Sequence, residues 1–420
     1  MYSMHPFFSR VALALATAAL LFPADTKRTV TDAEVQRVHR SAILIDTHND
    51  VTSATVDGLD IGKRRTDGHT DLPRMREGGQ GAEFFAVFVA ASYVQGNHAA
   101  NRTLQMIDTV RHDIIERYPR DFLFATTAAD IERAHREGKI AALLGIEGGH
   151  AIEDSLRLLR DYYALGVRYM TLTHSNSNNW ADSSGDPNPP HNGLTDFGKQ
   201  VVAEMNRLGM LVDISHVSDK TFWDALEASK APVFASHSSC RALANIPRNM
   251  TDEMIVALAK KGGVMQINFG CDFLSQKSAD ASALRRPEMA KALAGLQEKY
   301  KDDPAGRAEA RKKLFAEMGR GMVRATLDDV VAHIDRVVKI ASVDAVGLGS
   351  DFDGVGCVPE GLDDVSKWPN LTRALLERGY SATGIRKIYG GNLLRVLRAA
   401  ENVGRAPRPA AGPLAGLPAR

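Results

Sequence analysis

Cysteine is scarce in this sequence, with only Cys240, Cys271 and Cys357 among 420 residues. The three form no C-x-x-C pair, so a metal site built from thiolates is not indicated. They allow at most one disulfide, which leaves an odd thiol. A chain of this length can be held together by its own hydrophobic core without disulfides.

Clusters of basic residues with interleaved aromatic side chains are also missing. Lys and Arg number 52 against 51 Asp and Glu, and the formal net charge is +1. Proteins that bind nucleic acids usually carry a basic patch. We therefore exclude a nucleic acid partner and expect a small-molecule substrate.

No hydrophobic run has the length of a comfortable membrane span. The apolar run from Val11 to Phe22 is too short for one. Arg10 precedes it, and Pro23, Ala24 and a polar stretch follow, which is the order of a secretory signal peptide. We place the signal at residues 1–24; a buried first helix or an uncleaved anchor is the alternative. The expected protein is exported, periplasmic or secreted, and without a stable membrane anchor.

The rest of the chain alternates short apolar runs with longer amphipathic segments, which predicts an α/β fold with a parallel sheet. The runs expected to be strands are 42–46, 84–90, 140–146, 167–172, 210–214, 232–236, 263–269 and 345–350. Eight such units predict a (β/α)8 TIM-like barrel over residues 25–404. An open doubly wound sheet is the alternative, but no G-x-G-x-x-G follows the first strand.

Two segments fall outside this alternation. Residues 274–320 are charged and helix-prone, and they predict a helical insertion before the last strand. Such an insertion is either a solvent-exposed helical segment without a specific role, or a functional element that serves as a lid or in dimerisation. Residues 405–420 are rich in Pro, Ala and Gly and predict a disordered C-terminal tail.

Ionisable residues follow six of the eight expected strands. The active site of a (β/α)8 barrel lies at the carboxyl ends of the strands, so these side chains should meet at one mouth. They are His48, Asp50, Glu147, His174, His216, His237, Asp351 and Asp353.

Histidines and carboxylates without cysteine favour zinc or a similar divalent ion. His48 and Asp50 are two positions apart, so in an extended segment both leave on one face and can bind one ion. His216 and His237 come from neighbouring strands and could share another, while Glu147 has two oxygens and could bridge both. The residues therefore predict two zinc ions per chain, a pair that can hold hydroxide and polarise a carbonyl.

Six motifs, in this order, closely resemble those of the membrane (renal) dipeptidase family of the amidohydrolase superfamily. They are LIDTHND, GIEGGH, YMTLTHSNSNNWAD, LVDISHVS, FASHSSCRAL and VGLGSDFDG. The resemblance spans residues 41–398 and includes the spacing between motifs. It implies a zinc-dependent dipeptidase that hydrolyses small dipeptides through a metal-bridging hydroxide, including those with a D-residue at the C-terminal position, and that forms a homodimer.

The resemblance also assigns roles to residues. His48, Asp50, Glu147, His216 and His237 match zinc ligands, with Glu147 as the bridge. His174 matches a residue that contacts the substrate near the scissile carbonyl, and Arg248 matches the arginine that pairs with the substrate's carboxylate. Asp351 matches the residue that carries a proton to the leaving amine.

Two alternative functions are also compatible with the sequence. One is a related binuclear metal hydrolase of lactams, cyclic amides or esters, and the other is a non-catalytic exported binding protein. Asp213 and Asp353 are interpreted as groups that orient ligands or as ordinary strand-end acids, and His150 has no assigned role. The remaining histidines are expected to face solvent: His39, His69, His98, His112, His135, His191 and His333.

Overall fold

The computed structural model describes residues 28–301 and 321–405, together with residues 303, 306, 310, 313, 314 and 317. The expected signal peptide and the expected tail beyond Arg405 lie outside the described residues. Arg405 itself, which we assigned to the tail, is the last residue of a helix.

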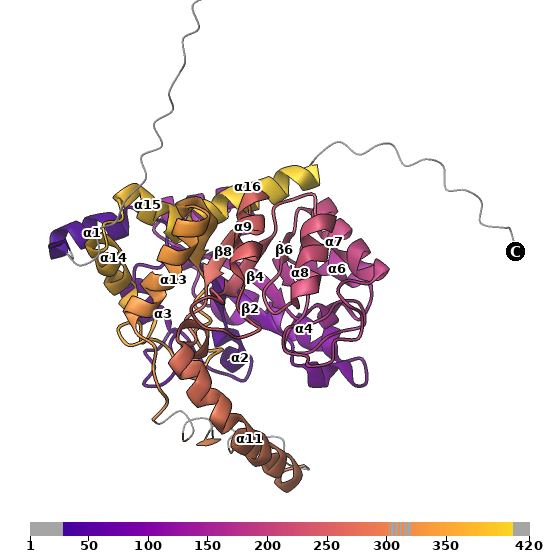
Figure 1. The fold of residues 1–420 in the computed structure, drawn as a ribbon. Coiled ribbons are helices and arrows are strands. Elements are labelled where there is room, and N and C mark those ends of the chain that lie inside the picture. The colour runs from indigo at the N-terminus through magenta and orange to yellow at the C-terminus, as the bar shows by residue number, and fades with distance from the viewer. Residues whose placement is uncertain are drawn as a thin grey trace, which may run out of the picture.

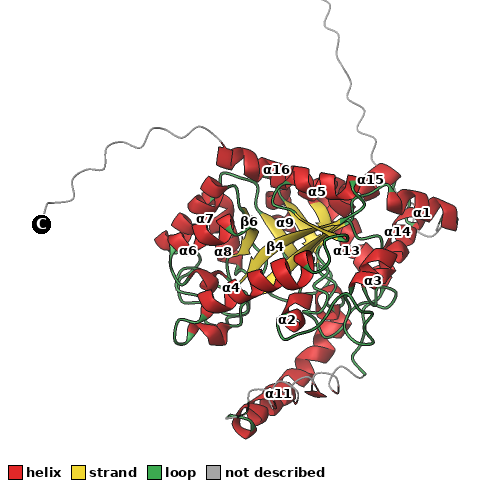
Figure 2. Cartoon of the chain, turned by 180° about the vertical axis from the view of Figure 1, so that it is seen from behind, coloured by secondary structure: helices red, strands yellow, loops and turns green. Residues whose placement is uncertain are grey.

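Eight parallel strands form a nearly closed barrel surrounded by helices, which confirms the predicted fold class (Figures 1 and 2). In sheet order the strands are β1 (Ile45–Asn49), β2 (Ala82–Phe88), β4 (Ile140–Glu147), β5 (Val167–Thr171), β6 (Leu211–Asp213), β7 (Phe234–Ser238), β8 (Val264–Ile267) and β9 (Val346–Leu348). Each expected apolar run contributes one of them.

The first and last strands meet just beyond the end of β9. Asn49 and Phe352 form a parallel bridge, and the amide of Asp50 donates to the carbonyl of Phe352 at 2.9 Å. The amide of Asp351 donates to the carbonyl of His48 at 3.0 Å. The carboxyl ends of β1 and β9 therefore place their polar residues side by side.

One further strand, β3 (Phe122–Phe124), was not predicted from the sequence. It pairs with Ile140–Ala142 at the start of β4, whereas β5 pairs with β4 from Leu144 onward. Because β3 has only three residues, its apolar run is too short to stand out from a loop.

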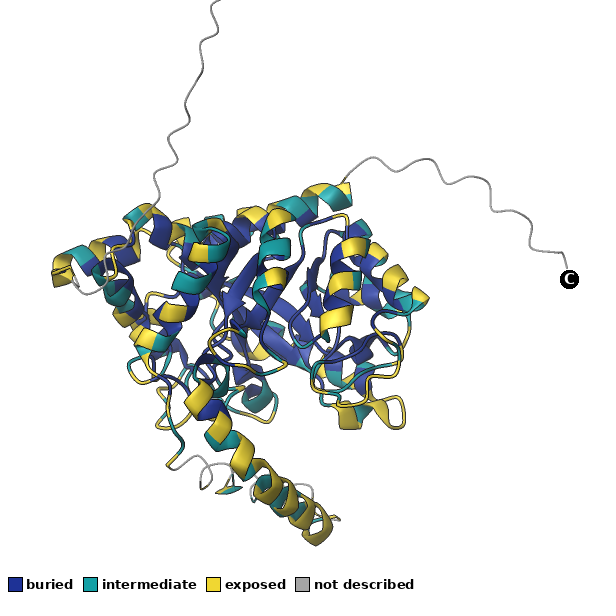
Figure 3. Cartoon of the chain, in the orientation of Figure 1, coloured by how far each residue is buried: buried dark blue, intermediate teal, exposed yellow. Residues whose placement is uncertain are grey.

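The described helices lie mostly around the outside of the barrel, buried on the side that faces it and exposed on the other (Figure 3). They are α1 (Asp32–Arg40), α2 (Val51–Thr55), α3 (Leu72–Glu77), α4 (Ala99–Thr109), α5 (Ala128–Arg136), α6 (Leu156–Ala164), α7 (Asp196–Leu208), α8 (Asp219–Ala228), α9 (Asp252–Lys260), α10 (Cys271–Leu274), α11 (Gln276–Lys299), α13 (Leu327–Ile340), α14 (Trp368–Glu377), α15 (Ala382–Arg386) and α16 (Asn392–Arg405). Among the residues that the structure describes, no helix combines the length and the apolar character that a membrane span requires.

Aromatic side chains fill the barrel interior beneath its mouth. Tyr169 packs between Phe84 and Phe234, with ring centroids 5.3 and 5.4 Å apart, and all three are fully buried. Burial of each such side chain stabilises the fold by about 1.5–3 kcal/mol. This layer of packed aromatic rings supports the strand ends above it.

The insertion begins with α11, which projects from the barrel (Figure 1). Only Ser278 and Ala279 of its residues are buried. Most of 302–320 lies outside the described residues. The predicted helical insertion is confirmed for its first part.

Candidate active site

The structure brings the polar strand-end residues together at one mouth of the barrel. His48 lies in β1, Glu147 ends β4 and His237 lies in β7, while the others follow their strands directly or within a few residues. Three overlapping groups place their ligand atoms within 4.8 Å of one another: His48, Glu147 and His237; Glu147, His174 and His216; and His48, Asp50 and Asp351.

Glu147 is at the centre of this cluster. Its Oε1 lies 2.9 Å from His216 Nε2, 3.3 Å from His237 Nε2 and 3.7 Å from His174 Nε2. Its Oε2 lies 3.6 Å from His48 Nε2. One carboxylate therefore faces imidazoles from four different strands with both of its oxygens.

A contact with Tyr169 fixes the tautomer of His48. The Tyr169 hydroxyl donates to the carbonyl of Thr47 at 3.1 Å, so it accepts from His48 Nδ1, which lies 2.8 Å away. With one proton on Nδ1, His48 directs Nε2 at the cluster. Burial lowers the pKa of this ring, but Tyr169, Glu147 and Asp50 raise it well above the usual histidine value, so a metal ion would bind in place of the Nε2 proton. Gly145 leaves the room for this tyrosine, because a Cβ there would lie 2.0 Å from Tyr169 Cζ.

His237 is oriented in a similar way through a serine. The Ser236 hydroxyl donates to Asp213 Oδ2 at 2.6 Å and lies 2.6 Å from His237 Nδ1. It therefore accepts the Nδ1 proton, and Nε2 of His237 is left as a lone pair. Asp213 thus acts on His237 through Ser236, as a group that orients a candidate ligand.

The cluster has the donor set and the unsatisfied atoms that a cation site requires. His48 Nε2 is buried without a hydrogen-bond partner, and it lies 3.2 Å from Asp50 Oδ2. Imidazole nitrogens and carboxylate oxygens without thiolates are the ligands that zinc and related divalent ions accept. The residues present therefore fit metal ions.

Charge and burial set the protonation of the cluster. Burial alone would raise the pKa of Glu147, but His48 and His174 nearby, together with the imidazoles of His216 and His237 beside the carboxylate, hold it well below its usual range. Burial also lowers the pKa of His216 and of His237 well below the usual histidine value. An ionised carboxylate thus faces two neutral imidazoles, the charge state that metal ligands need.

Asp351 lies beside this cluster and is almost completely buried. Burial raises the pKa of its carboxyl to about 8, and the carboxylates of Asp50 and Glu147 add to this effect, whereas His48 lowers it. The backbone of Asp351 is left-handed, with φ +62°, as is that of His216 with φ +66°. Such backbone costs roughly 1–3 kcal/mol per residue and is common at functional sites.

His174 is positioned at the open side of the cluster. Its ring lies 4.5 Å from that of His216 and 4.8 Å from that of Phe88, measured between centroids. Its side chain is 23% exposed, more than those of Glu147 and His237. It can reach a molecule that enters from the mouth.

Arg248 is held by the end of β7. Its Nη1 donates to Ser238 Oγ at 2.9 Å and its Nη2 donates to the carbonyl of His237 at 2.8 Å. Among the described residues, no carboxylate forms an ion pair with it, and burial lowers its pKa to about 10. A partly buried, charged guanidinium without an ion-paired carboxylate is suited to bind an anionic ligand group.

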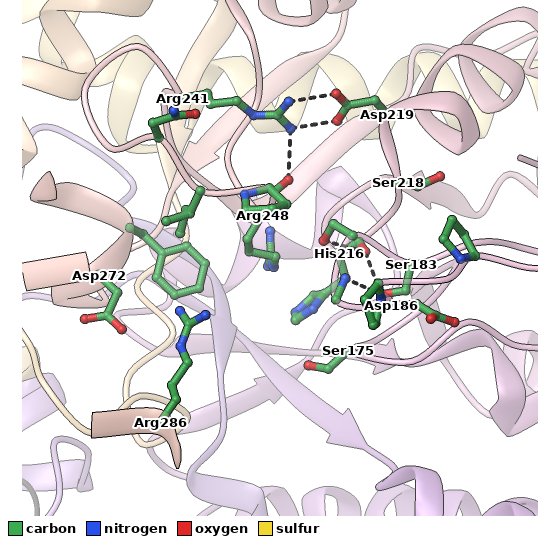
Figure 4. A pocket seen from close by; sticks show the side chains of 18 residues that line it. Ser175, Ser183, Asp186, His216, Ser218, Asp219, Arg241, Arg248, Asp272 and Arg286 are labelled. Carbon is green, nitrogen blue, oxygen red and sulfur yellow. Dashed lines mark hydrogen bonds and ion pairs between the residues drawn. The ribbon is translucent and has the colours of Figure 1, made fainter. Parts of the chain in front are cut away.

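A cavity of about 950 Å³ opens beside these residues (Figure 4). His216 and Arg248 line its inner part, and Ser175, Ser183 and Asp186 line the side formed by the β5 loop. Asp272 and Arg286 line the side formed by α10 and α11. The start of the insertion therefore contributes directly to the cavity wall.

Three of the histidines expected to face solvent do not do so. His39 is buried between Thr372 Oγ1 and the carbonyl of Gly78, and His333 is fully buried. His69 is largely enclosed and accepts from the amide of Asp353. These expectations were wrong because a histidine on a helix or in a polar loop can turn inward when both ring nitrogens find partners.

Asp353 and His150 lie outside the cluster of candidate ligands. Asp353 forms an ion pair with Arg65 at 3.2 Å and accepts from the amide of His69. The Nε2 of His150 donates to the carbonyl of Val89 at 2.7 Å. Both side chains shape loops around the mouth, which gives His150 a packing role.

Sequence reasoning missed three residues that support the site: Tyr169, Ser236 and Asn268. Asn268 follows β8, and its Nδ2 donates to Asp351 Oδ2 at 2.8 Å. Tyr169 sits in the apolar run VRYMTL, where it looks like an ordinary core residue. For Tyr169 the only sequence signal was its position in the expected strand, inward-facing and one layer below the strand end.

The sequence model of the membrane dipeptidase family, peptidase family M19, matches residues 32–409. The probable dipeptidase PvdM from Pseudomonas aeruginosa is 25% identical with a TM-score of 0.73, over 88% of this chain and 98% of that one. A dipeptidase described as a metallopeptidase of family M19 is 27% identical with a TM-score of 0.70, over 86% and 98%. A Rhodobacter sphaeroides metallopeptidase, liganded with a phosphinate mimic of the dipeptide L-Ala-D-Ala, is 26% identical with a TM-score of 0.68, over 86% and 99%.

Proposed function

We propose that this chain, which belongs to the membrane dipeptidase family M19 and is a metallo-dipeptidase, uses two zinc ions to hydrolyse small dipeptides, including L-Xaa-D-Xaa. The observation that carries the proposal is the position of Glu147, whose two oxygens face His48 on one side and His216 with His237 on the other. A carboxylate placed in this way can bridge two ions.

The candidate ligands divide into two sets that share Glu147. His48 and Asp50 would hold one ion, and His216 and His237 would hold the other. When bound, such a pair lowers the pKa of water and polarises the scissile carbonyl. The contacts of Tyr169 with His48 and of Ser236 with His237 keep the Nε2 lone pairs of both imidazoles available for this purpose.

The substrate would be placed by Arg248 and His174. Arg248 lines the cavity without an acidic partner, so it would pair with the terminal carboxylate of the dipeptide. His174, exposed at the mouth, would donate a hydrogen bond to the oxyanion that develops from the carbonyl oxygen. A peptide with further residues after the carboxylate position would lose this pairing.

Asp351 would carry the proton. Its carboxylate takes a proton as water attacks the carbonyl carbon, and it returns that proton to the amide nitrogen as the C–N bond breaks. Burial raises the pKa of Asp351 to about 8, and a group near the working pH can both accept and release a proton.

Export and dimer formation belong to the same proposal. Cys271 and Cys357 form a disulfide, and disulfides persist mainly in oxidising compartments. This supports a periplasmic or secreted protein, cleaved after a signal within residues 1–24. The homodimer is inferred from the family resemblance alone.

A substrate screen with metal analysis tests the proposal. Purified protein is assayed with L-Ala-L-Ala, L-Ala-D-Ala, a tripeptide, a β-lactam and an aryl ester, and its metal content is measured. We expect turnover of dipeptides of both stereochemistries, little of the tripeptide, and two zinc ions per chain. Turnover of the lactam or ester alone would instead indicate a related hydrolase, and dipeptide binding without turnover would indicate a binding protein.

A further inference from the structure

Asn268 lies directly after β8 and is fully buried against Asp351. Its Oδ1 accepts from the amide of Gly270 at 2.6 Å, and its Nδ2 donates to Asp351 Oδ2 at 2.8 Å. A backbone N–H can only donate, so Gly270 fixes which end of the side-chain amide is oxygen. The NH₂ group must therefore face the carboxylate of Asp351.

The backbone around this pair is tied to the neighbouring strands. The amide of Asn268 donates to the carbonyl of Ser238 at 2.9 Å, and the amide of Phe269 donates to the carbonyl of Ser350 at 3.0 Å. Asn268 is thus held between the ends of β7 and β9. Its side chain has little freedom to reorient.

Asn268 leaves one oxygen of Asp351 for chemistry. The hydrogen bond from Asn268 occupies Oδ2. The other oxygen, Oδ1, points toward the ligand cluster, because a Cβ on Gly354 would lie 2.3 Å from both Asp351 Oδ1 and Asp50 Oδ2. The oxygen that exchanges a proton in the proposed reaction is therefore Oδ1.

A disulfide joins the two loops that carry this pair. Cys271 follows Asn268 on the β8 loop, and Cys357 follows Asp351 on the β9 loop. Their Cα atoms lie 5.5 Å apart, and the amide of Cys271 also donates to the carbonyl of Cys357 at 3.1 Å. The loop after β9 needs such support, since Asp351 has a left-handed backbone that costs free energy to maintain.

We infer that Asn268 is a positioning residue that aims Asp351 Oδ1 at the reacting water, and that the Cys271–Cys357 disulfide keeps the two loops in the register that this contact needs. The inference rests on the proposed function, because it assumes that Asp351 transfers the proton. Loss of either element should therefore lower kcat and leave substrate binding and metal content in place.

Substitution of Asn268 is the first test. In Asn268→Ala we expect kcat for L-Ala-D-Ala to fall by about tenfold or more, which corresponds to about 1.4 kcal/mol of lost transition-state stabilisation. KM should stay within about threefold and zinc content should be unchanged. Asn268→Asp, which puts an acceptor against Asp351, should lose more activity than Asn268→Ala.

Asn206 offers a matched control. It is a buried asparagine whose Oδ1 accepts from the amide of Lys230 and whose Nδ2 donates to Ser229 Oγ, on the outer helices. Asn206→Ala should lower the melting temperature without changing kcat per folded molecule. A fall in kcat equal to that of Asn268→Ala would show that loss of a buried amide alone explains the effect.

The disulfide gives a second route that needs no substitution at Asn268. A dithiol reductant breaks the S–S bond of the zinc-loaded enzyme, forms two thiols and is itself oxidised to a disulfide. The thiol count after denaturation should rise from one to three, and kcat should fall while KM and zinc content are retained. In Cys271→Ser/Cys357→Ser, adding Asn268→Ala should cost less than it does in the wild type.

Besides an equal loss of kcat in the Asn206→Ala control, three outcomes would overturn the inference. The first is an unchanged kcat after complete reduction, and the second is an unchanged kcat in Asn268→Ala. The third is independence of the two changes, in which the fold-losses of kcat from Asn268→Ala and from loss of the disulfide simply multiply in the combined variant. If the wild type turns over no dipeptide at all, the proposed function itself fails. If the wild type hydrolyses dipeptides and these variants match its kcat, only the role of Asn268 and the disulfide fails.

Discussion

His216 Nε2 and His237 Nε2 face one another at 2.9 Å, and both approach the same oxygen of Glu147. His237 has its proton on Nδ1, toward Ser236, so its lone pair points at His216. Two neutral imidazoles in this arrangement are held together best by a cation that both can bind. Predictions about metal binding follow from this geometry.

Substitution of the central carboxylate should abolish metal binding. Glu147→Gln removes the negative charge that faces four imidazoles, so we expect the loss of both ions and of activity, by about 10³-fold or more. Metal analysis and dipeptide assays measure both. Glu137→Gln, on the exposed end of α5, is the control and should retain its metal. Retention of zinc at the wild-type level in Glu147→Gln would contradict the bridging role.

Removal of the Tyr169 hydroxyl should weaken metal binding while the aromatic ring stays packed in the barrel core. Partners that orient metal-ligating histidines typically contribute 10–100-fold to affinity. We therefore expect Tyr169→Phe to release zinc to a chelator at about 10–100-fold lower chelator concentration. Tyr389→Phe is the control, since that hydroxyl is equally buried but contacts Thr372. Equal zinc retention in the two variants would argue against the proposed tautomer control.

Arg248 should act on substrate binding. A hydrogen bond to a charged group contributes about 1.5–3 kcal/mol, so Arg248→Met should raise KM for dipeptides by about 10–100-fold. A dipeptide amide, which lacks the carboxylate, should show little difference between the wild type and the variant. Arg241→Met is the control, because Arg241 lines the same cavity but is paired with Asp219.

His333 should make the fold sensitive to acid. Its Nδ1 accepts from the amide of Cys240 at 2.9 Å and its Nε2 donates to the carbonyl of Leu274 at 3.0 Å, so the folded protein needs the neutral ring. Burial lowers its pKa to about 4, against about 6.5 in the unfolded chain. Between these values the unfolded state binds the extra proton, so the free energy of unfolding falls as the pH decreases from about 6.5 to 4.

The acid effect of His333 amounts to about 3.5 kcal/mol at most, because its pKa differs by about 2.5 between the two states at about 1.4 kcal/mol per pKa unit. Urea unfolding of metal-free protein across this pH range measures it. His333→Gln should flatten part of the pH dependence, and His135→Gln, an exposed residue of α5, should not. Identical pH profiles for His333→Gln and the wild type would contradict this account.

The barrel strands and the convergence of polar residues were predictable because two simple patterns carry them. Buried parallel strands are apolar along their whole length, and active-site residues follow directly after them, as in LIDTHND. Elements that depend on tertiary contacts gave no such pattern. Tyr169 resembles a core residue until its hydroxyl is seen against His48.

Pairings between distant residues were also hidden from the sequence. Cys271 and Cys357 are 86 residues apart, and nothing local distinguishes them from Cys240, which stays a buried free thiol. His39 and His333 look like surface residues on amphipathic helices, because their buried partners, Thr372 and Leu274, come from remote segments. Such contacts require the folded chain.

The central claim, that Glu147 bridges two ions, is tested most directly by anomalous X-ray scattering from crystals of the zinc-loaded protein. The account predicts two peaks, each about 2.0–2.2 Å from an oxygen of Glu147. One peak should contact His48 and Asp50, and the other should contact His216 and His237. A single fully occupied peak, or two peaks of which only one contacts Glu147, would contradict the account.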